Sequence, residues 1–428
     1  MQEEKSVCII GLGYVGLPLA CLCAKNGYKV FGFDTHSDKV EKINQGISPI
    51  DDEELKQQVS ELKGKISAFD DERVIANSSI VIVCVPTPVD ESKNPDLNPL
   101  IEACKSIKKN MRKNQLIIIE STVNPGVTRK IVLPILESSS MKAGKDFFLG
   151  YCPERIDPGN VVFKIEKIAR VVGGIDEASL EKTSKFYESI IDAKIKKLNS
   201  MEAAEAVKIF ENTFRDVNIA FVNELAMSFA RMNIDIKEVI EGASTKPFGF
   251  MAFYPGPGCG GHCIPVDPYY LINDARLNGF HHEFLSHARK INESMPLYVV
   301  ELIQNALNEK SKAMQNSKIA VLGVAYKANV DDIRESPSLE VIHELQKRKA
   351  NLKIFDPHVK HKSNVESFEQ ALKDSDLVVV LTHHSFFVEN LSPKLLKQHN
   401  IDAIIDARNC LNKEAFEKEG IYYKGIGR

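Results

Sequence analysis

The segment Gly-Leu-Gly-Tyr-Val-Gly at residues 11–16 restricts the fold of this chain more than any other feature. It follows the apolar run SVCII at residues 6–10 and precedes a helix-forming stretch. Gly11 permits a tight turn, Gly13 lets a pyrophosphate approach the backbone at a helix N-terminus, and Gly16 lets the helix pack closely on the strand. A glycine pattern alone is a weak signal, but with a strand before it and a helix after it, it predicts a dinucleotide-binding unit.

An acidic residue completes this unit, because Asp34 ends the next apolar run. A carboxylate there can accept both ribose hydroxyls and would repel a 2′-phosphate, so NAD is favoured over NADP. Lys39 either reaches the adenosine end of the cofactor or is a solvated helix lysine. Thr87 either contacts the cofactor or belongs to a turn that two prolines shape. We expect Tyr14 and Val15, inside the glycine segment, to line the same site.

Apolar runs and helix-forming stretches alternate through the first third of the chain, and the alternation returns after residue 317. Such runs are typical of strands that are buried on both faces of a parallel sheet. In the first third we expect strands at residues 6–10, 29–33, 79–85, 115–120 and 147–151. We expect the crossover helices near residues 16–26, 51–63, 98–111 and 126–138.

Between the two alternating regions, residues 203–233 contain no proline or glycine, and as a helix they would span about 45 Å. Residues 247–268 are rich in both and predict a shaped loop. We therefore predict an α/β chain in which two Rossmann-like, doubly wound domains are joined by a long central helix. The expected domains are an NAD-binding domain at 1–200, a central helical domain at 201–310 and a degenerate nucleotide-binding domain at 311–428.

Charge and cysteine content argue against several classes of protein. The 428 residues carry 55 Lys and Arg against 58 Asp and Glu, so no basic excess is available for a nucleic acid. We expect no membrane span, because no run of 18 apolar residues is present, and no secretion, because the N-terminus lacks a basic leader. The nine scattered cysteines, an odd number, suit a reduced, cytoplasmic protein.

The segment GCGGHCIPVDP at residues 258–268 is the sharpest local feature of the chain. Its glycines are expected to leave room and free backbone N–H groups for a substrate. A Cys263 thiolate can attack a carbonyl and hold a covalent intermediate, and Asp267 can accept a proton or hold a water. Two other readings stay open: a metal site formed by Cys259, His262 and Cys263, although no second ligand pair is evident, and an inert buried cysteine.

Lys208 and Asn212 lie four residues apart on the predicted long helix and therefore share one face. Side by side they form a donor cluster suited to a developing oxyanion, or else a solvated polar stripe. Glu211 and Arg215, at the same spacing, are expected to be an ordinary pair that supports the helix.

Seven motifs in order resemble the UDP-glucose/UDP-N-acetylhexosamine 6-dehydrogenase family, and together they run nearly from end to end. They are GLGYVGLPLA at 11–20, VPTPVD at 85–90, ESTVNPG at 120–126, CPERIDPGN at 152–160, EAVKIFENTFRDVNIAFVNELA at 205–226, PGPGCGGHCIPVDPYYL at 255–271 and GVAYKANVDDIRESP at 323–337.

This resemblance implies a four-electron oxidation of the C6 alcohol of a UDP-sugar to a carboxylate with two NAD⁺. Cys263 would trap the aldehyde as a thiohemiacetal and then carry a thioester. The other implied roles are oxyanion stabilisation by Lys208 and Asn212, acid–base chemistry by Asp267, thioester hydrolysis by Glu154 and water positioning by Thr122. Implied cofactor contacts include Thr122 and Arg334. Implied substrate contacts are Glu154, Arg155, Lys208, Asn212, Tyr254, Gly256, Gly258, Gly260, Lys327 and Arg408.

The residues around Cys263 resemble the N-acetylhexosamine branch, because CIPVD lacks the lysine of CxxKD and His262 precedes the cysteine. Residues 245–258 are most similar to UDP-N-acetylglucosamine 6-dehydrogenases of surface-polysaccharide pathways. UDP-N-acetylmannosamine is the alternative substrate, and UDP-glucose the next. Lys246 stands near an arginine that faces the partner subunit in many relatives. We also expect a homodimer or higher homo-oligomer, formed through the long helix.

Two further classes remain: a two-electron dehydrogenase of the hydroxyacid type, and a sensor that binds NAD or a nucleotide sugar without turnover. The first has no need of the thiol of Cys263.

Overall fold

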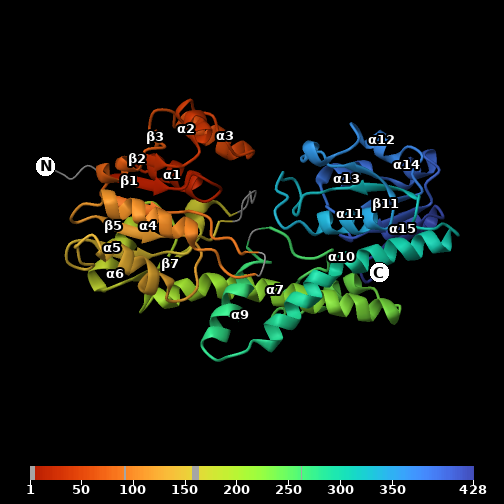
Figure 1. Ribbon diagram of the computed structural model, residues 1–428. Coiled ribbons are helices and arrows are strands. Elements are labelled where there is room, and N and C mark those ends of the chain that lie inside the picture. The colour runs from red at the N-terminus through yellow and green to blue at the C-terminus, as the bar shows by residue number, and fades with distance from the viewer. Residues whose placement is uncertain (1–4, 91–92, 157–162, 262) are drawn as a thin grey trace. The chain divides into compact units, whose positions relative to one another are not determined.

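The computed structural model describes residues 5–90, 93–156, 163–261 and 263–428. The chain divides into two compact units. The N-terminal unit comprises Met1–Glu211 with Tyr269–Asn278, and the C-terminal unit comprises Asn212–Pro268 with Gly279–Arg428. Each unit is built around its own sheet (Figure 1). The expected domain boundaries near residues 200 and 310 stay predictions.

The sheet of the N-terminal unit has the strand order β3-β2-β1-β4-β5-β6-β7-β8. All neighbours are parallel except β6 and β7, which pair antiparallel. The apolar runs predict β1, β2, β4, β5 and β6, but not β3, β7 and β8, which are short or rich in polar residues and glycine. The strands are β1 Ser6–Ile10, β2 Lys29–Phe33, β3 Ile66–Phe69, β4 Ile80–Val83, β5 Leu116–Ile119, β6 Phe148–Tyr151, β7 Arg170–Gly174 and β8 Ile195–Lys197.

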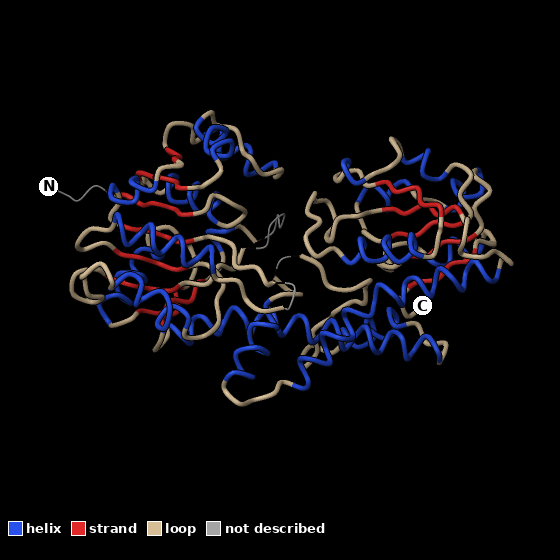
Figure 2. The backbone as a smooth tube through the Cα atoms, viewed as in Figure 1, coloured by secondary structure: helices blue, strands red, loops and turns tan. Residues whose placement is uncertain are grey.

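Both faces of this sheet are buried, as alternate residues of β1 show. Val7 and Ile9 belong to one apolar cluster, Cys8 and Ile10 to another, and none is more than 3% exposed. Figure 2 shows the red strands of the sheet with blue helices around them. These helices are α1 Gly16–Lys25, α2 Ser37–Asn44, α3 Glu53–Glu61, α4 Asn98–Asn110, α5 Leu133–Glu137 and α6 Glu177–Glu188.

The long helix α7 spans Met201–Arg231, so the helix predicted at 203–233 is confirmed to within two residues at each end. Its first residues belong to the N-terminal unit and the rest, from Asn212, to the C-terminal unit. Three further helices follow it in the chain: α8 Ile236–Ser244, α9 Asp267–Leu277 and α10 Glu283–Glu309. In the described part of the chain, no helix combines the length and apolarity needed to cross a bilayer.

The sheet of the C-terminal unit is entirely parallel, in the order β10-β9-β11-β12-β13. Here too alternate residues of one strand, Ile319 and Ala320 of β9, enter different apolar clusters. The predicted fold class is therefore confirmed. One α/β sheet region precedes the long helix in the sequence, and a second one follows it. The elements are β9 Lys318–Leu322, α11 Pro337–Lys347, β10 Asn351–Phe355, α12 Phe368–Leu372, β11 Leu377–Val380, α13 Ser385–Asn390, α14 Pro393–Gln398, β12 Ala403–Asp406, α15 Lys413–Lys418 and β13 Tyr422–Gly425.

Candidate active site

The glycine segment between β1 and α1 has the geometry that its pattern predicts. Gly11 has φ +90°, and a Cβ on it would lie 2.8 Å from the carbonyl oxygen of Cys84. A Cβ on Gly16 would lie 1.9 Å from the carbonyl oxygen of Gly11, so any side chain there would force the turn and the helix apart. By contrast, nothing lies within 4 Å of a Cβ at Gly13, which leaves that part of the loop open. Tyr14 and Val15 are partly buried against the core beside this turn.

Asp34, at the carboxyl end of β2, is bonded to the same loop. Its Oδ2 accepts the backbone N–H of Leu12 (2.9 Å) and the ammonium of Lys39 (2.7 Å), and its Oδ1 accepts the N–H of His36 (3.1 Å). Burial opposes ionisation of this carboxyl, but the bonds to Lys39, Leu12 and His36 outweigh it and lower the pKa of Asp34. Lys39 is therefore an ion-pair partner of Asp34, and its contact with the adenosine end of the cofactor stays a prediction.

Replacing Asp34 with alanine is expected to raise the KM for NAD about tenfold to a hundredfold. The variant loses the carboxylate predicted to accept the ribose hydroxyls and the acceptor that holds Leu12. Each hydrogen bond to a charged group contributes roughly 1.5–3 kcal/mol. Initial-rate kinetics with NAD varied would measure this, with Asp38→Asn on the exposed face of α2 as the matched control. An unchanged KM in the Asp34 variant would contradict the role assigned to this residue.

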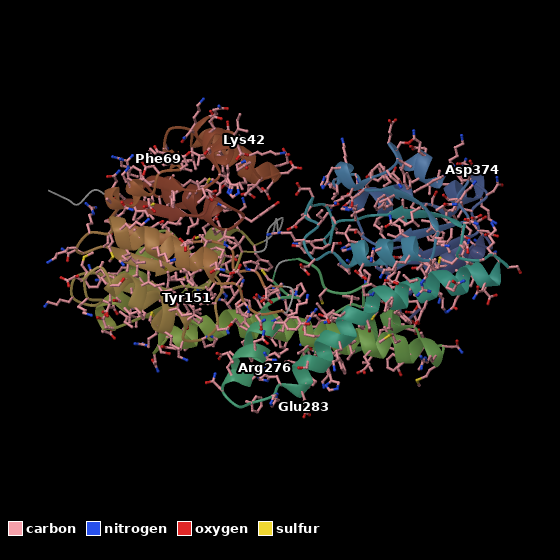
Figure 3. All side chains as sticks on the ribbon, viewed as in Figure 1. Lys42, Phe69, Tyr151, Arg276, Glu283 and Asp374 are labelled. Atoms are coloured by element: carbon pink, nitrogen blue, oxygen red, sulfur yellow. The ribbon has the colours of Figure 1, made fainter. Side chains whose placement is uncertain are left out.

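Thr87 and Thr122 are brought together at the carboxyl ends of neighbouring strands. The Thr87 hydroxyl donates to the carbonyl oxygen of Thr122 (2.8 Å), and the Tyr270 hydroxyl donates to that of Thr87 (2.5 Å). The hydroxyl of Tyr151, labelled in Figure 3, donates to the carbonyl oxygen of Ser121 (3.2 Å). The hydroxyl of Thr87 therefore holds the backbone that carries Thr122, and its contact with the cofactor stays a prediction.

Glu154 and Lys208 form a buried ion pair in the N-terminal unit. The Lys208 ammonium lies 3.7 Å from Glu154 Oε2, and both residues are less than 10% exposed. Next to them, Arg155 pairs with Glu211 through Nε (3.2 Å) and Nη2, and donates from Nη1 to the carbonyl oxygen of Ala169 (2.9 Å). A lysine beside a carboxylate can stabilise an oxyanion while the carboxylate handles a proton or a water.

Asn212 and Asp267 form a second buried pair, in the C-terminal unit. The Asn212 amide donates to Asp267 Oδ2 (2.5 Å), and its oxygen accepts a bond from Arg215 (2.5 Å). The Asp267 N–H, at the start of α9, donates to the carbonyl oxygen of Cys263 (2.8 Å). The expected Glu211–Arg215 pair is wrong, because each of these side chains bonds elsewhere. Lys208 and Asn212 are both buried, so the solvated-stripe alternative is also wrong.

The two cysteines of the loop differ in their surroundings. Both residues are partly exposed, but the Cys259 thiol lies beside the buried carboxyl of Asp216. Burial, together with the neighbouring charge of Asp216, raises the pKa of the Cys259 thiol to about 12. Among the described residues, no group of three His, Cys, Asp or Glu side chains is placed to hold a metal ion, and His262 lies outside those residues. Of the two thiols, Cys263 is therefore the better candidate for a nucleophile.

Iodoacetamide at pH 8 is expected to leave Cys259 unmodified in the native protein. A thiol with a pKa of about 12 is ionised in roughly one molecule in 10⁴ at that pH, and only the thiolate reacts. Peptide mass spectrometry after timed labelling would measure modification at each site, and labelling in urea provides the fully reactive reference. Equal rates at Cys259 in native and unfolded protein would contradict the expectation.

Close packing accounts for the absence of side chains at several of the loop glycines. Cβ atoms on Gly260 and Gly261 would lie 2.5 and 2.8 Å from atoms of Tyr326. The N–H of Gly256 is not free, because it donates to Asn223 Oδ1 (3.0 Å). A Cβ on Gly258 would likewise lie 3.0 Å from the carbonyl oxygen of Asn292. Contact of Gly256, Gly258 and Gly260 with a substrate stays a prediction.

Arg408 and the loop after β9 lie together at one edge of the C-terminal sheet. Arg408 donates from Nε to the carbonyl oxygen of Leu381 (2.9 Å) and from Nη2 to that of Tyr326 (3.2 Å), the residue before Lys327. Burial lowers the pKa of Arg408 to about 10, so it remains cationic at neutral pH. Arg334, in the same loop, forms a two-pronged pair with Asp332 (3.0 and 2.6 Å). Tyr254, another of the predicted substrate contacts, is half exposed.

Five buried polar residues of α7 follow one helical stripe, and three of them, Glu205, Asp216 and Asn223, were not predicted from the sequence. With about 100° per residue, five side chains of α7 fall within about 80° of arc. Each is no more than 6% exposed. The regular spacing of these polar residues on an otherwise mixed helix is the signal that could have found them. The five are Glu205, Lys208, Asn212, Asp216 and Asn223.

Comparison with known proteins matches most of the chain to the domains of a single protein family. Residues 5–191, 202–294 and 320–413 match the NAD-binding, central and UDP-binding domains of the UDP-glucose/GDP-mannose dehydrogenase family. The NAD cofactor predicted from residues 11–16 is thereby confirmed.

Relatives with related names match over most of their length. A UDP-N-acetyl-D-glucosamine 6-dehydrogenase of Pseudomonas aeruginosa is 39% identical, with 84% of each chain covered. A UDP-N-acetyl-D-mannosamine dehydrogenase of Pyrococcus horikoshii is 34% identical, with 99% of each covered. The solved structure of UDP-D-ManNAc dehydrogenase from that organism gives a TM-score of 0.92 at 34% identity, again with 99% of each chain covered. The chain therefore belongs to the UDP-glucose/GDP-mannose dehydrogenase family, whose members are NAD-dependent oxidoreductases.

Proposed function

We propose that this protein oxidises C6 of UDP-N-acetylglucosamine to the uronic acid, consuming two NAD⁺ and one water and releasing two NADH. UDP-N-acetylmannosamine is the alternative substrate and UDP-glucose the next. The relatives named above support an N-acetylhexosamine, and both sugar epimers occur among them. The observation that carries the proposal is the arrangement of Cys263 and Asp267, in which the latter is held by Asn212.

The residues that hold the cofactor fit NAD. The open side of Gly13 and the N-terminus of α1 suit a pyrophosphate, and the Asp34 carboxylate suits the ribose hydroxyls. When bound, NAD⁺ supplies the hydride acceptor for each of the two oxidations.

The protein's own residues then handle protons and the carbon intermediate. Asp267 takes the proton of the C6 hydroxyl as the alcohol becomes an aldehyde. The Cys263 thiolate adds to that aldehyde, and the second oxidation converts the thiohemiacetal into a thioester. A water, assisted by Glu154, attacks the thioester carbonyl and releases the carboxylate and the thiol, while Lys208 and Asn212 stabilise the oxyanions. A four-electron oxidation needs such a trap, because a free aldehyde would leave between the steps.

Counting the NADH formed per sugar tests this proposal. The protein would be mixed with excess NAD⁺ and limiting UDP-N-acetylglucosamine, UDP-N-acetylmannosamine or UDP-glucose in parallel. Two NADH per UDP-N-acetylglucosamine, with little from the others, is the expected result. Two per UDP-N-acetylmannosamine would replace the sugar assignment, and one per sugar would mean a two-electron dehydrogenase without a role for Cys263. Binding without NADH would mean a sensor.

We also propose that the protein acts as a homodimer or higher homo-oligomer in the cytoplasm. An apolar groove of about 550 Å³ is lined by α7, α8 and residues 249–253, and Phe221 at its edge is 59% exposed. Such an exposed apolar patch supports self-association. Nearby, the Lys246 ammonium lies 4.8 Å from the centre of the Phe248 ring. None of the nine cysteines takes part in a disulfide in the described structure, in keeping with a reducing compartment. Sedimentation of only a monomer would overturn the oligomer.

A further inference from the structure

The loop after β9, residues 323–336, contains Lys327, the predicted substrate contact. On one side of this lysine the backbone is firmly anchored. The N–H groups of Val324 and Ala325 donate to Asp356 Oδ2 (2.6 and 3.1 Å), and the carbonyl oxygen of Ala325 accepts the Thr382 hydroxyl (2.6 Å). The N–H of Tyr326 donates to the carbonyl oxygen of Asp332 (3.1 Å), which ties together the two ends of the segment that contains Lys327. The residues between these ends need a further anchor.

His384 supplies that further anchor. The backbone N–H of Asn329, two residues after Lys327, donates to His384 Nδ1 (2.8 Å). An amide N–H can only donate, so Nδ1 is an acceptor and the ring proton resides on Nε2. Nε2 in turn lies 3.1 Å from Asp356 Oδ2. The imidazole thus links the end of β10 to the loop, with each nitrogen assigned one role.

Both members of the link are rigidly placed. His384 and Asp356 are fully buried. Asp356 Oδ1 also accepts the N–H groups of His358 (2.8 Å) and Val359 (2.9 Å). Burial opposes ionisation of this carboxyl, but His384 and the backbone N–H donors outweigh it and lower the pKa of Asp356. The ring is therefore held by a carboxylate that has no freedom to turn.

Asn329 is held in a conformation that needs such support. Its φ is +60°, in the left-handed region that side chains other than glycine rarely adopt. Its amide oxygen accepts the Ser385 N–H (3.0 Å), and its amide nitrogen donates to the Ser385 hydroxyl (2.9 Å). Two successive residues, His384 and Ser385, thus fix Asn329 through three hydrogen bonds.

Asp34 and Asp356 end the second strand of their respective sheets, but their surroundings differ. Asp34 is also buried, but it is bonded to only one N–H of its glycine loop, and the ammonium of Lys39 occupies another of its acceptor positions. Asp356 is closed off by four backbone N–H groups and His384, so it cannot serve as a ribose acceptor. In the C-terminal unit this carboxylate instead supports the loop.

We propose that His384 is a positioning residue for binding of the sugar nucleotide: through the Asn329 N–H it holds the loop that presents the Lys327 cation to the anionic substrate. The inference rests on the proposed function, because it takes the substrate to be a UDP-sugar. A loosened loop would present the lysine in many geometries, and substrate binding would have to restore the lost order. The effect should appear in the KM for the UDP-sugar and leave the chemistry intact.

Two substitutions separate the two nitrogens of the ring. In His384→Gln the amide nitrogen can reach the place of Nε2 and donate to Asp356, but nothing accepts the Asn329 N–H. In His384→Asn an acceptor remains at the place of Nδ1, and the donor to Asp356 is lost. We expect the glutamine variant to raise the KM for the UDP-sugar about tenfold, with kcat within twofold and the KM for NAD unchanged. The asparagine variant should stay within threefold of the original protein.

Hydrogen exchange measures the same loop without any substrate. Peptides covering residues 326–332 should exchange faster in His384→Gln than in the original protein, and at the original rate in His384→Asn. Equal effects of the two variants on KM and exchange, or a loss confined to kcat, would overturn the proposal. Should the glutamine variant not fold, Ser385→Ala loosens Asn329 without changing the buried pair, and it should raise the KM for the UDP-sugar about threefold.

These arms keep the two proposals apart. Failure of the original protein to oxidise any UDP-sugar would refute the proposed function, whatever exchange shows. Turnover of a UDP-sugar with the same KM in His384→Gln would refute the role of His384 and leave the proposed function standing.

Discussion

Replacing Cys263 with serine is expected to lower the steady-state rate at which the UDP-sugar is converted to the uronic acid by at least about 10³-fold. Removal of a nucleophile from an enzyme that works through a covalent intermediate typically has effects of this size or larger. A serine hydroxyl is a far weaker nucleophile than a thiolate, because it is hardly ionised at neutral pH. The thiohemiacetal would not form, and the second oxidation would lack its substrate. Steady-state kinetics with the sugar identified by the stoichiometry experiment would measure the loss.

Cys259→Ser is the matched control for this experiment. It removes a thiol from the same loop, four residues away, and a hydroxyl can still lie beside Asp216. Because the Cys259 thiol has a pKa of about 12 and is protonated at neutral pH, its loss should leave kcat within about threefold. Full activity in the Cys263 variant would instead point to a two-electron dehydrogenase.

Replacing Arg289 with methionine is expected to lower the free energy of unfolding by about 3–5 kcal/mol. Arg289 Nη1 lies 2.5 Å from Asp216 Oδ1, and the two side chains are 4% and 1% exposed. Burial already raises the pKa of Asp216, with Arg289 as the main opposing influence. Loss of the guanidinium would leave a buried carboxylate without its cation, which costs this much in other proteins. Urea unfolding of the full chain would measure the change.

Two further variants make this second prediction sharper. Lys290→Met, at the exposed neighbouring position on α10, should change stability by less than about 0.5 kcal/mol. The double variant Asp216→Asn with Arg289→Met removes both charges and should recover a large part of the loss, because the neutral amide is far less costly to bury. A double variant as unstable as the single one would show that the guanidinium acts through packing rather than charge.

Local patterns predict those parts of the fold that depend on neighbours in the chain. The turn at Gly11 and Gly16, the apolar strands and α7 all follow from spacing and residue type within about 30 residues. The edge strand β8 could not be predicted, because IKK at Ile195–Lys197 has no apolar pattern and forms a strand only beside β7. Its identity depends on a partner distant in the sequence.

The sequence predicted which residues belong to the candidate site, but not which of them bond to one another. Glu211 and Arg215 each bond a different group from the one that their spacing indicates. Long charged side chains can reach many partners, so tertiary placement rather than spacing along a helix decides which carboxylate or amide they meet. The glycines near Cys263 show the same limit, because the ring of Tyr326 that excludes a side chain there comes from 65 residues further along the chain.

The polar stripe of α7 fixes the spacing of a series of contacts along the helix. Its side chains from Glu205 to Asn223 serve, in turn, the backbone N–H groups of Gly126 and Thr128, then Glu154, Asp267, Arg289 and Gly256. A substitution at one of these positions removes one of these contacts. A single inserted residue would instead rotate every later side chain of the helix by about 100° and shift it by about 1.5 Å along the axis. None of these later side chains would then meet its partner. A change in the length of α7 between Glu205 and Asn223 would therefore disrupt more of these contacts than any single substitution in it.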